Sequence, residues 1–409
     1  MVTVKFADFK DSALKFDNQA GIAFVIDKDN VWVKTGTKSK QLCYKEDAVV
    51  EGIEGEPDEQ VAFCVEHAAV QRGVDACVNA PNVSNELSML VDTERKVVSF
   101  EVRHILTIPA TEQEPEKTEV IGISKRGPFK FEVGYAAKTT IELPTGISAE
   151  VRAQVGDQID KIPSQELAKV FELLGVLKAP IFITAATYDE TKDADGNVIS
   201  KTLKTPSRAF VSGSVYGEMA IANFKRGVRV SYELSAPVGK LLAKSTGDAE
   251  CLARVDDQKV RLFSVQTDSF FVSGVVEKVS SQSMNSANMS KLAGLDYASL
   301  RFNCPKVLVA NVTDGRHTLK LTGDKLFVDE NVIAVFNLVK EGETGEHLLA
   351  KMGSGVAMDC KQIGKLLYDD AMVPFAIARF DMENNVHSYV FRIGNTEDAT
   401  KPCWYLPAM

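Results

Sequence analysis

The chain has 409 residues, of which 45% are hydrophobic and 25% are charged. This balance is typical of a soluble globular protein, and the length predicts two to four domains. Acidic residues outnumber basic ones by 56 to 47, and the net charge of −9 excludes a simple basic coat for nucleic acid. A locally basic surface on an acidic body is still compatible with that total.

The sequence lacks the signals of membrane insertion and secretion. No segment holds the roughly 20 uninterrupted apolar residues that a membrane helix needs. The first residues, MVTVKFADFKDSALKF, contain no apolar block behind a basic end. The 7 cysteines are scattered and odd in number, which indicates reduced core thiols and not a disulfide framework. We therefore expect a cytoplasmic protein with no membrane partner.

The first two helical patterns begin near residues 8 and 66 and are weak. The segment 8–16 carries Lys10 beside a blurred apolar stripe. The segment 66–79 has apolar residues on one side and Arg72 on the other. Both patterns are followed by alternating apolar and polar residues, which indicate half-buried strands.

An alternating strand at 98–108 is followed by the acidic stretch PATEQEPEKTEV at 109–120. Its proline and its charges predict a loop or linker. A further insertion extends to about residue 150, and a domain boundary is expected near residue 138.

The third helical pattern, at 163–175, has a clear apolar stripe at helical spacing and places Lys169 on the opposite side. Pro163 suits the first turn and Gly175 suits the stop. The stripe consists of Leu167, Val170, Phe171 and Leu174. Strand alternation follows at 208–221.

The fourth pattern, at 235–246, places apolar residues on one face and Lys240 and Lys244 on the other. Alternating segments follow at 260–276. The polar run SSQSMNSANMS at 280–290 predicts a second domain boundary near residue 284.

The last two patterns lie in the final third of the chain. The segment 303–311 carries Lys306 but is so rich in valine that it could also form a strand. The segment 359–368 packs its aliphatic residues on one side and turns Lys361 and Lys365 away. Strand alternation appears at 319–328 and 375–393.

Six helix-plus-strands units, taken in pairs, predict three domains of an α+β protein at 1–138, 139–284 and 285–409. Lysine is ordinary on the solvated face of a single helix. Its recurrence on three clear helices, in a chain of net charge −9, instead favours one shared anionic partner.

Motifs for chemistry are missing from the sequence. There is no phosphate-binding loop, no dinucleotide fingerprint and no C-x-x-C pair, and the five histidines stand apart from any nucleophile motif. Cys64 and His67 lack the second ligand pair of a zinc site. KDADGNV, at 192–198, fits a hairpin turn better than a calcium loop. We therefore expect no metal, no cofactor and no enzymatic activity.

The repeated helix-plus-strands units and the lysines on their helices resemble those of the DNA sliding clamps. The match is to the three-domain bacterial type, the β subunit of the replicative DNA polymerase. Residues 235–279 are similar to the second-domain pattern, which ends in a Ser, an aliphatic pair and an acid; residues 355–393 are similar to the last unit. The chain ends in CWYLPAM, where bacterial clamps end in an apolar strand with a Met-Pro-Met segment. Val215–Met219 replaces the usual Asp-Gly-x-Arg-Leu turn, which fits a divergent clamp such as a phage-encoded one.

The resemblance implies a ring with helices lining the hole and sheets outside, closed by two copies of the chain. Such a ring would encircle double-stranded DNA without sequence specificity and act as a processivity factor. It would hold the DNA polymerase, the clamp loader and other replication and repair proteins through short apolar peptides. The DNA-binding residues would be Lys10, Arg72, Lys169, Lys240, Lys244, Lys306, Lys361 and Lys365.

By position, the partner-peptide pocket of the clamps maps onto the second-domain turn and the C-terminal segment. The residues concerned are Tyr216, Met219, Leu406, Pro407 and Met409.

Two other hypotheses for the function of the protein stay open. A strand-rich viral structural or assembly protein would turn its basic helix faces toward acidic protein. An enzyme would assemble a deep pocket of titrating groups from distant segments.

Overall fold

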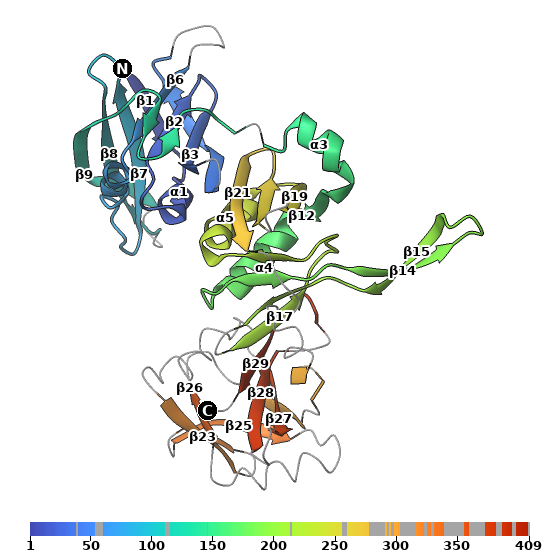
Figure 1. The fold of residues 1–409 in the computed structure, drawn as a ribbon. Helices are drawn as coiled ribbons and strands as arrows, with labels where there is room; N and C mark the ends of the chain where they lie inside the picture. The colour runs from blue at the N-terminus through green and yellow to red at the C-terminus, as the bar shows by residue number, and fades with distance from the viewer. Residues whose placement is uncertain are drawn as a thin grey trace. The chain divides into compact units, whose positions relative to one another are not determined.

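A computed structural model shows a strand-rich chain that divides into two compact units (Figure 1). The first unit is Met1–Ala168 with Glu233–Glu277, and the second is Lys169–Tyr232 with Lys278–Met409. The structure describes residues 1–37, 40–53, 60–110, 115–144, 146–212, 215–255, 260–277, 291–292, 294–295, 298–302, 316–322, 325–328, 331–338, 356–359, 373–381, 387–394 and 398–407.

An antiparallel five-stranded sheet forms one layer of the first unit. Its strands, in spatial order, are β5 (Ala48–Glu51), β1 (Val2–Phe6), β7 (Val83–Asp92), β8 (Val97–Ile108) and β9 (Lys117–Lys130). Alternate residues of β8, such as Val98, Phe100 and Val102, are buried. Helix α2 (His67–Val74) packs on this sheet, because a Cβ added at Gly73 would lie 2.5 Å from the Phe100 ring.

The second sheet of this unit crosses the predicted domain boundary near residue 138. Strand β21 pairs with β4, with Phe271 opposite Cys43 and Ser273 opposite Gln41. One continuous sheet therefore joins strands from the first and second predicted domains. Its order is β12 (Asp160–Pro163), β19 (Asp248–Val255), β20 (Val260–Gln266), β21 (Phe270–Glu277), β4 (Lys40–Glu46), β3 (Val31–Thr37), β2 (Ile22–Ile26) and β6 (Val61–Val65).

Helices α1 (Ser12–Phe16) and α5 (Tyr232–Lys244) accompany this sheet. The Ser12 hydroxyl donates a buried hydrogen bond to the Pro237 carbonyl, at 3.3 Å, so the two helices are in contact. A Cβ at Gly274 of β21 would lie 2.9 Å from Leu234 of α5. The sequence predicted α5 from residue 235; the helix instead begins at Tyr232, which places Pro237 inside it.

The segment after β9 is tied to the first unit. Strands β10 (Tyr135–Ala136) and β11 (Thr139–Thr140) form a small hairpin whose turn contains the predicted boundary. The Thr139 hydroxyl donates to the Gly21 carbonyl at 2.7 Å, and the buried Lys34 ammonium contacts Thr140 Oγ1 at 3.0 Å. The boundary at 138 stays a prediction.

Two short elements follow that the sequence did not predict: helix α3 (Ala149–Val155) and the 3₁₀ turn η1 (Gly156–Gln158). The side chain of Ser148 caps α3 by accepting a hydrogen bond from the Val151 N–H at 3.3 Å. Arg152 pairs with Glu250 of β19 and anchors the helix to the sheet.

The division between the units falls inside helix α4 (Ser164–Gly175). The predicted stripe is confirmed, because Leu167, Val170, Phe171 and Leu174 are all buried while Lys169 is exposed. Burial of this stripe explains why the segment is helical, because a short helix in a protein is stabilised mainly by packing its apolar face.

The second unit contains a sheet that joins the second and third predicted domains. Strands β17 and β29 pair with Tyr216 opposite Tyr405 and Glu218 opposite Cys403. The order is β18 (Val228–Val230), β13 (Ile181–Ile183), β16 (Arg208–Val211), β17 (Tyr216–Ala220), β29 (Cys403–Pro407), β28 (His387–Ile393), β27 (Val373–Asp381), β22 (Ala298–Phe302), β25 (Asn331–Leu338), β24 (Lys325–Val328), β23 (Arg316–Thr322) and β26 (Val356–Asp359).

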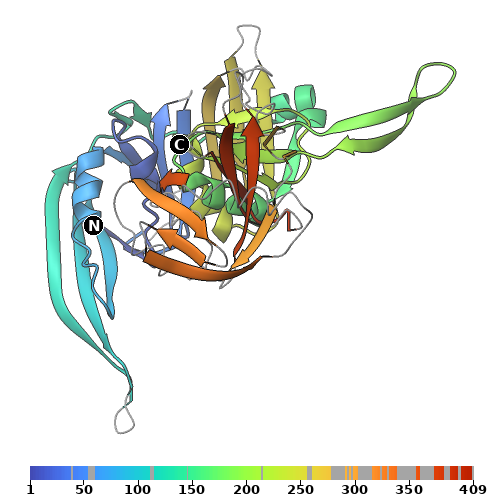
Figure 2. The ribbon, with the colours of Figure 1, turned by 90° about the horizontal axis from the view of Figure 1, so that it is seen from below.

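A separate hairpin, β14 (Thr187–Lys192) with β15 (Val198–Thr205), projects from the second unit, as Figures 1 and 2 both show. Every residue of both strands is exposed. The predicted turn at KDADGNV is confirmed: the Asp193 carboxylate accepts the backbone N–H groups of Asp195 and Asn197 at 3.0 and 2.8 Å.

The alternating segments predicted as strands form β8, β16–β17, β20–β21, β23–β24 and β27–β28. The predicted loop at 109–120 is partly wrong, because β9 already begins at Lys117. An edge strand tolerates the charges that suggested a loop. The predicted helices at 303–311 and 359–368 lie outside the described residues, apart from Asp359 at the end of β26.

Candidate nucleic-acid interface

Helix α5 presents two lysines on one exposed face. Lys240 and Lys244 are exposed and four residues apart, while Val238, Leu241 and Leu242 are buried beneath them. Lys240 makes no ion pair with any residue that the structure describes. Lys244 forms an ion pair with Asp8, and this carboxylate raises the pKa of the Lys244 ammonium.

Lys169 of α4 and Arg72 of α2 are also exposed, as the sequence predicted. Lys169 has Glu166 and Glu172 three residues away on either side. Arg72 stands in the last turn of α2, where a cation also interacts favourably with the helix dipole.

Lys10 lies in a different environment from the other predicted cations. It precedes α1, because that helix starts only at Ser12. Its side chain is 12% exposed, and its ammonium lies 3.6 Å from Glu46 and 3.5 Å from Asp47. The same ammonium donates to the Lys45 carbonyl at 3.0 Å. Lys10 is therefore engaged by groups of the protein itself, with the Asp47 carboxylate as its charged partner at neutral pH.

Glu46 explains why Lys10 is held there. Its side chain is buried, and burial raises the pKa of its carboxyl to about 8, although Lys10 opposes the shift. Oε1 accepts the Lys10 backbone N–H at 3.0 Å, while Oε2 has no hydrogen-bond partner among the described residues. A buried carboxyl with one oxygen unsatisfied favours a nearby cation.

Three predicted DNA-binding residues, Lys306, Lys361 and Lys365, lie outside the described residues, as does Met409 of the predicted pocket. Pro407 ends β29, where its backbone faces Val390 of β28.

The structure divides the remaining pocket residues between the two faces of the sheet. Tyr216 and Met219 are three positions apart on β17, so their side chains point to opposite faces of the sheet. Met219 is 2% exposed and Leu406 is 5% exposed. Trp404 shares the face of Leu406, and its ring packs over Gly217, which has no Cβ to obstruct it.

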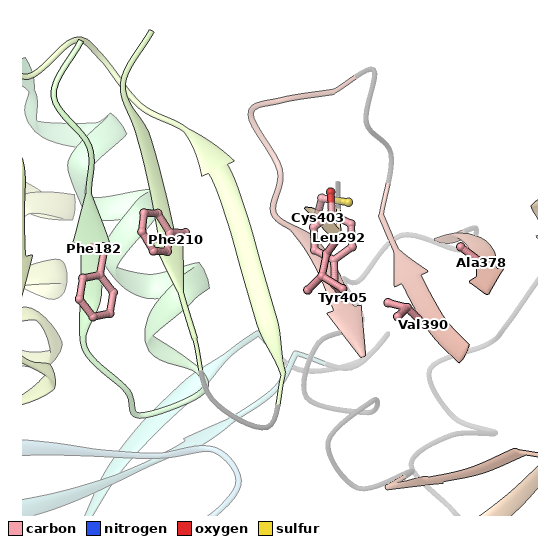
Figure 3. Close-up of a cluster of buried hydrophobic side chains, with 7 residues drawn as sticks. All are labelled: Phe182, Phe210, Leu292, Ala378, Val390, Cys403 and Tyr405. Atoms are coloured by element: carbon pink, nitrogen blue, oxygen red, sulfur yellow. The ribbon is translucent and has the colours of Figure 1, made fainter. Parts of the chain in front are cut away.

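An apolar cluster lies on the other face of the sheet (Figure 3). Tyr216 packs against this cluster. Phe182 and Phe210 stack there with ring centroids 5.3 Å apart. Tyr216 is partly exposed at the margin of this group. The buried members of the cluster are Phe182, Phe210, Leu292, Ala378, Val390, Cys403 and Tyr405.

A polar group lies on the same face across the β17–β29 pairing. Arg208 donates to Glu218 at 3.1 Å, and the Tyr405 hydroxyl donates to the other oxygen of that carboxylate, also at 3.1 Å. Burial raises the pKa of Tyr405, so this hydroxyl stays a donor. Phe182, Phe210, Glu218 and Tyr405 were not predicted as site residues. Alternation along β16 places Phe210 on one face with Arg208, and alternation along β17 places Glu218 on one face with Tyr216, but no local pattern links these strands to Phe182 on β13 or Tyr405 on β29.

Within the described ranges, no group of three or more His, Cys, Asp or Glu side chains is placed to hold a metal ion. None of the helices in those ranges is both long and apolar enough to cross a membrane.

Two sheets that each continue across a predicted domain boundary, together with amphipathic helices carrying exposed cations, define an α+β protein with the DNA sliding-clamp fold. The predicted resemblance is confirmed at the level of the fold. No protein-family model and no curated protein sequence matches the chain.

Bacterial clamps are among the individual structures similar to this chain. The DNA polymerase III β subunit of Thermotoga maritima superposes with a TM-score of 0.55 and 10% identity, over 100% of this chain and 99% of that one. The Borrelia burgdorferi β subunit, solved with a natural product, gives 0.54 and 10% over 100% and 98%. The Helicobacter pylori β clamp, bound to a DNA ligase peptide, gives 0.54 and 7% over 100% and 99%.

Proposed function

We propose that this protein is a sliding clamp: a non-enzymatic processivity factor that encircles duplex DNA and tethers the replicative polymerase and other replication and repair proteins. The observation that carries the proposal is the full-length agreement of the fold with sliding clamps, over 100% of this chain and 99% of the Thermotoga β subunit. Because a shared fold does not by itself fix function, the proposal also draws on the exposed cations of α2, α4 and α5, which suit contact with phosphates.

The physical basis of the function is contact with phosphates. Phosphates carry charge without sequence information, so lysines and arginines on helix faces would hold DNA and still let it slide. We assign this role to Lys240 and Lys244 first, because α5 carries two exposed lysines four residues apart. Arg72 and Lys169 follow, together with Lys306, Lys361 and Lys365. Lys10 is left out, because its ammonium is engaged by Glu46 and Asp47.

The assembly we propose is a ring of two copies, closed by head-to-tail contacts. A polymerase held by a ring on DNA gains a high effective concentration at its template without any new contact to the DNA. Such a protein works where chromosomes are copied, which places it in the cytoplasm of a bacterium or of a phage-infected host.

For partner peptides and the clamp loader we propose the sheet face around Tyr216. Tyr216 is the residue of the predicted pocket whose described side chain is partly exposed. Met219 and Leu406 would act indirectly, by packing the β17–β29 pairing from the opposite face.

The proposal is tested by imaging and by processivity. Negative-stain images of the purified protein should show a flat ring with a central hole, at the native mass of a dimer. The variant Lys240→Glu/Lys244→Glu should keep ring and mass but lose most stimulation of long-product synthesis by a clamp-dependent polymerase, because two attractive contacts become repulsive. Glu51→Lys, a charge change on the β5–β1 sheet, is the control.

A compact particle without a hole would refute the clamp assignment and favour an assembly protein or an enzyme. A ring whose activity is unchanged in the double variant would keep the clamp and remove α5 from its DNA interface.

A further inference from the structure

Asp8 neutralises one of the two cations on the exposed face of α5. Its carboxylate forms an ion pair with the Lys244 ammonium, and both side chains are well exposed, 74% for Asp8 and 48% for Lys244. Lys240, one turn earlier, has no such partner among the described residues. Two lysines at equivalent positions on one helix face therefore carry unequal effective charge.

The loop that carries Asp8 is fixed in place by hydrogen bonds on both sides. Before it, the Ala7 N–H donates to the Asp47 carbonyl at 2.9 Å. After it, the Lys10 N–H donates to Glu46 at 3.0 Å, and the Tyr44 hydroxyl donates to the Lys10 carbonyl at 2.6 Å. The buried Ser12–Pro237 hydrogen bond then fixes the start of α1 against α5 itself.

These contacts distinguish the pair from a casual surface encounter. An ordinary exposed ion pair must restrain two mobile side chains, which is why it is worth so little. Here the backbone of Asp8 is already positioned opposite α5 by contacts that the pair does not make. The fold places a carboxylate at Lys244 whether or not the ion pair stabilises the protein.

Two other acidic residues near Lys244 also favour the charged form of its ammonium. Asp47 and Glu46 also raise the pKa of its ammonium, after the larger effect of Asp8. The cation that faces these acids from the same loop, Lys10, is already paired with both of them. An incoming phosphate at Lys244 would therefore meet a site where carboxylates compete for the ammonium.

We propose that Asp8 sets the strength of DNA contact at α5, by competing with phosphate for Lys244. The inference rests on the proposed clamp function and adds a regulating residue to its interface. The consequence is weaker binding of DNA at α5. Lys240 attracts the phosphates at all times, whereas Lys244 contributes only while it is not paired with Asp8. Weak contact suits a surface along which DNA must move.

The test compares Asp8→Asn with wild type in binding to a fluorescent linear duplex, titrated over a range of potassium chloride concentrations. Freeing Lys244 should tighten binding about three- to fivefold at low salt, as expected for loss of a competing ion pair. The slope of log affinity against log salt should become steeper, by up to about 0.9, for one added phosphate contact. Asp8→Ala should behave alike, and melting curves check that both variants fold.

Glu51→Gln is the matched control, because it removes the same charge from the exposed Lys5–Glu51 pair on the β1–β5 sheet. It should leave the slope unchanged. In the Lys244→Ala background, Asp8→Asn should have no further effect, because the two residues act as a pair.

Equal gains in Asp8→Asn and Glu51→Gln would overturn the inference, as would a gain that persists without Lys244. Salt-dependent binding by wild type with no response to Asp8→Asn would leave the clamp function standing and reject only the role of Asp8. No DNA binding by any variant, with no ring in the images, would reject both.

Discussion

Glu46 is a buried carboxyl, and its burial makes the stability of the folded protein depend on pH. Burial raises its pKa to about 8 in the folded protein, against an ordinary value of 4.5. The folded state thus binds this proton more tightly than the unfolded state does. The resulting stabilisation is complete below about pH 4.5 and is lost as the pH rises through 8, because the charged form must then be kept buried.

Replacing Glu46 by Gln should remove this dependence. The amide oxygen can still accept the Lys10 N–H, while the charge is absent at every pH. We expect the melting temperature of Glu46→Gln to match or fall below that of wild type at pH 6 and to exceed it at pH 9. Between pH 6 and pH 9, the free energy of unfolding of Glu46→Gln should rise relative to that of wild type by on the order of 2 kcal/mol. This follows because each pKa unit corresponds to about 1.4 kcal/mol. Parallel pH profiles of the two proteins would contradict the buried, proton-binding assignment.

Lys10 also shows what sequence reasoning can and cannot recover at this scale. Its charge and spacing matched a helix-face lysine, but its environment is decided by Glu46, 36 residues away, whose burial no local pattern reveals. Lys169 and Lys240 were predicted correctly as exposed, because an apolar stripe determines which side of a helix faces water. The opposite orientations of Tyr216 and Met219 follow from strand periodicity alone and were available from the sequence.

At the scale of elements, the β14–β15 hairpin is held together by its own contacts. Tyr188 stands opposite Leu203, and two cross-strand ion pairs, Lys201–Glu190 and Lys204–Asp189, lie beside them. All residues of both strands are exposed, so the hairpin contributes no burial to the core of its unit.

We expect the hairpin to be dispensable for folding. Replacing residues 189–202 by Asn-Gly would join Tyr188 to Leu203, which already face each other, through a two-residue turn. The melting temperature should change by less than about 2 °C, because no buried apolar surface is removed. Phe182→Ala, which removes a buried stacked ring from the neighbouring strand β13, should by contrast cost about 3–5 kcal/mol. A large loss of stability on hairpin removal would show that the hairpin packs against the protein.

Elements with strong local periodicity were the ones the sequence predicted. Helix α4 was found almost to the residue, whereas α3, at seven residues and with a single capping serine, carries too little pattern to be recognised. The pairings that join the domains, β21 with β4 and β17 with β29, have no local signal at all. They depend on strands far apart in the chain, which no local pattern connects.

At the scale of the whole molecule, the two long sheets make the predicted domains interdependent. A fragment ending at residue 138 would contain β4 without β21 and would expose the edge that β21 covers. Exposed strand edges promote association.

We therefore expect the fragment 1–138 to aggregate when it is expressed alone, and to become soluble when it is co-expressed with 139–409. Size-exclusion chromatography would measure both states. A cut at the tip of the β14–β15 hairpin, near Gly196, is the control, because it severs neither sheet pairing and should leave the two pieces associated at the mass of the intact protein. A monomeric, soluble fragment 1–138 would show that β4 does not need its partner strand.

The pairing of β21 with β4 also determines the order in which the nascent chain can fold. Strand β4 leaves the ribosome early, whereas β21 follows it by roughly 200 residues. At about 5–20 residues per second, the edge of β4 waits on the order of 10–40 s for its partner. During that interval the ribosome-bound chain carries an uncovered strand that other nascent chains could meet. A chaperone that covers this edge during translation would therefore raise the yield of folded protein.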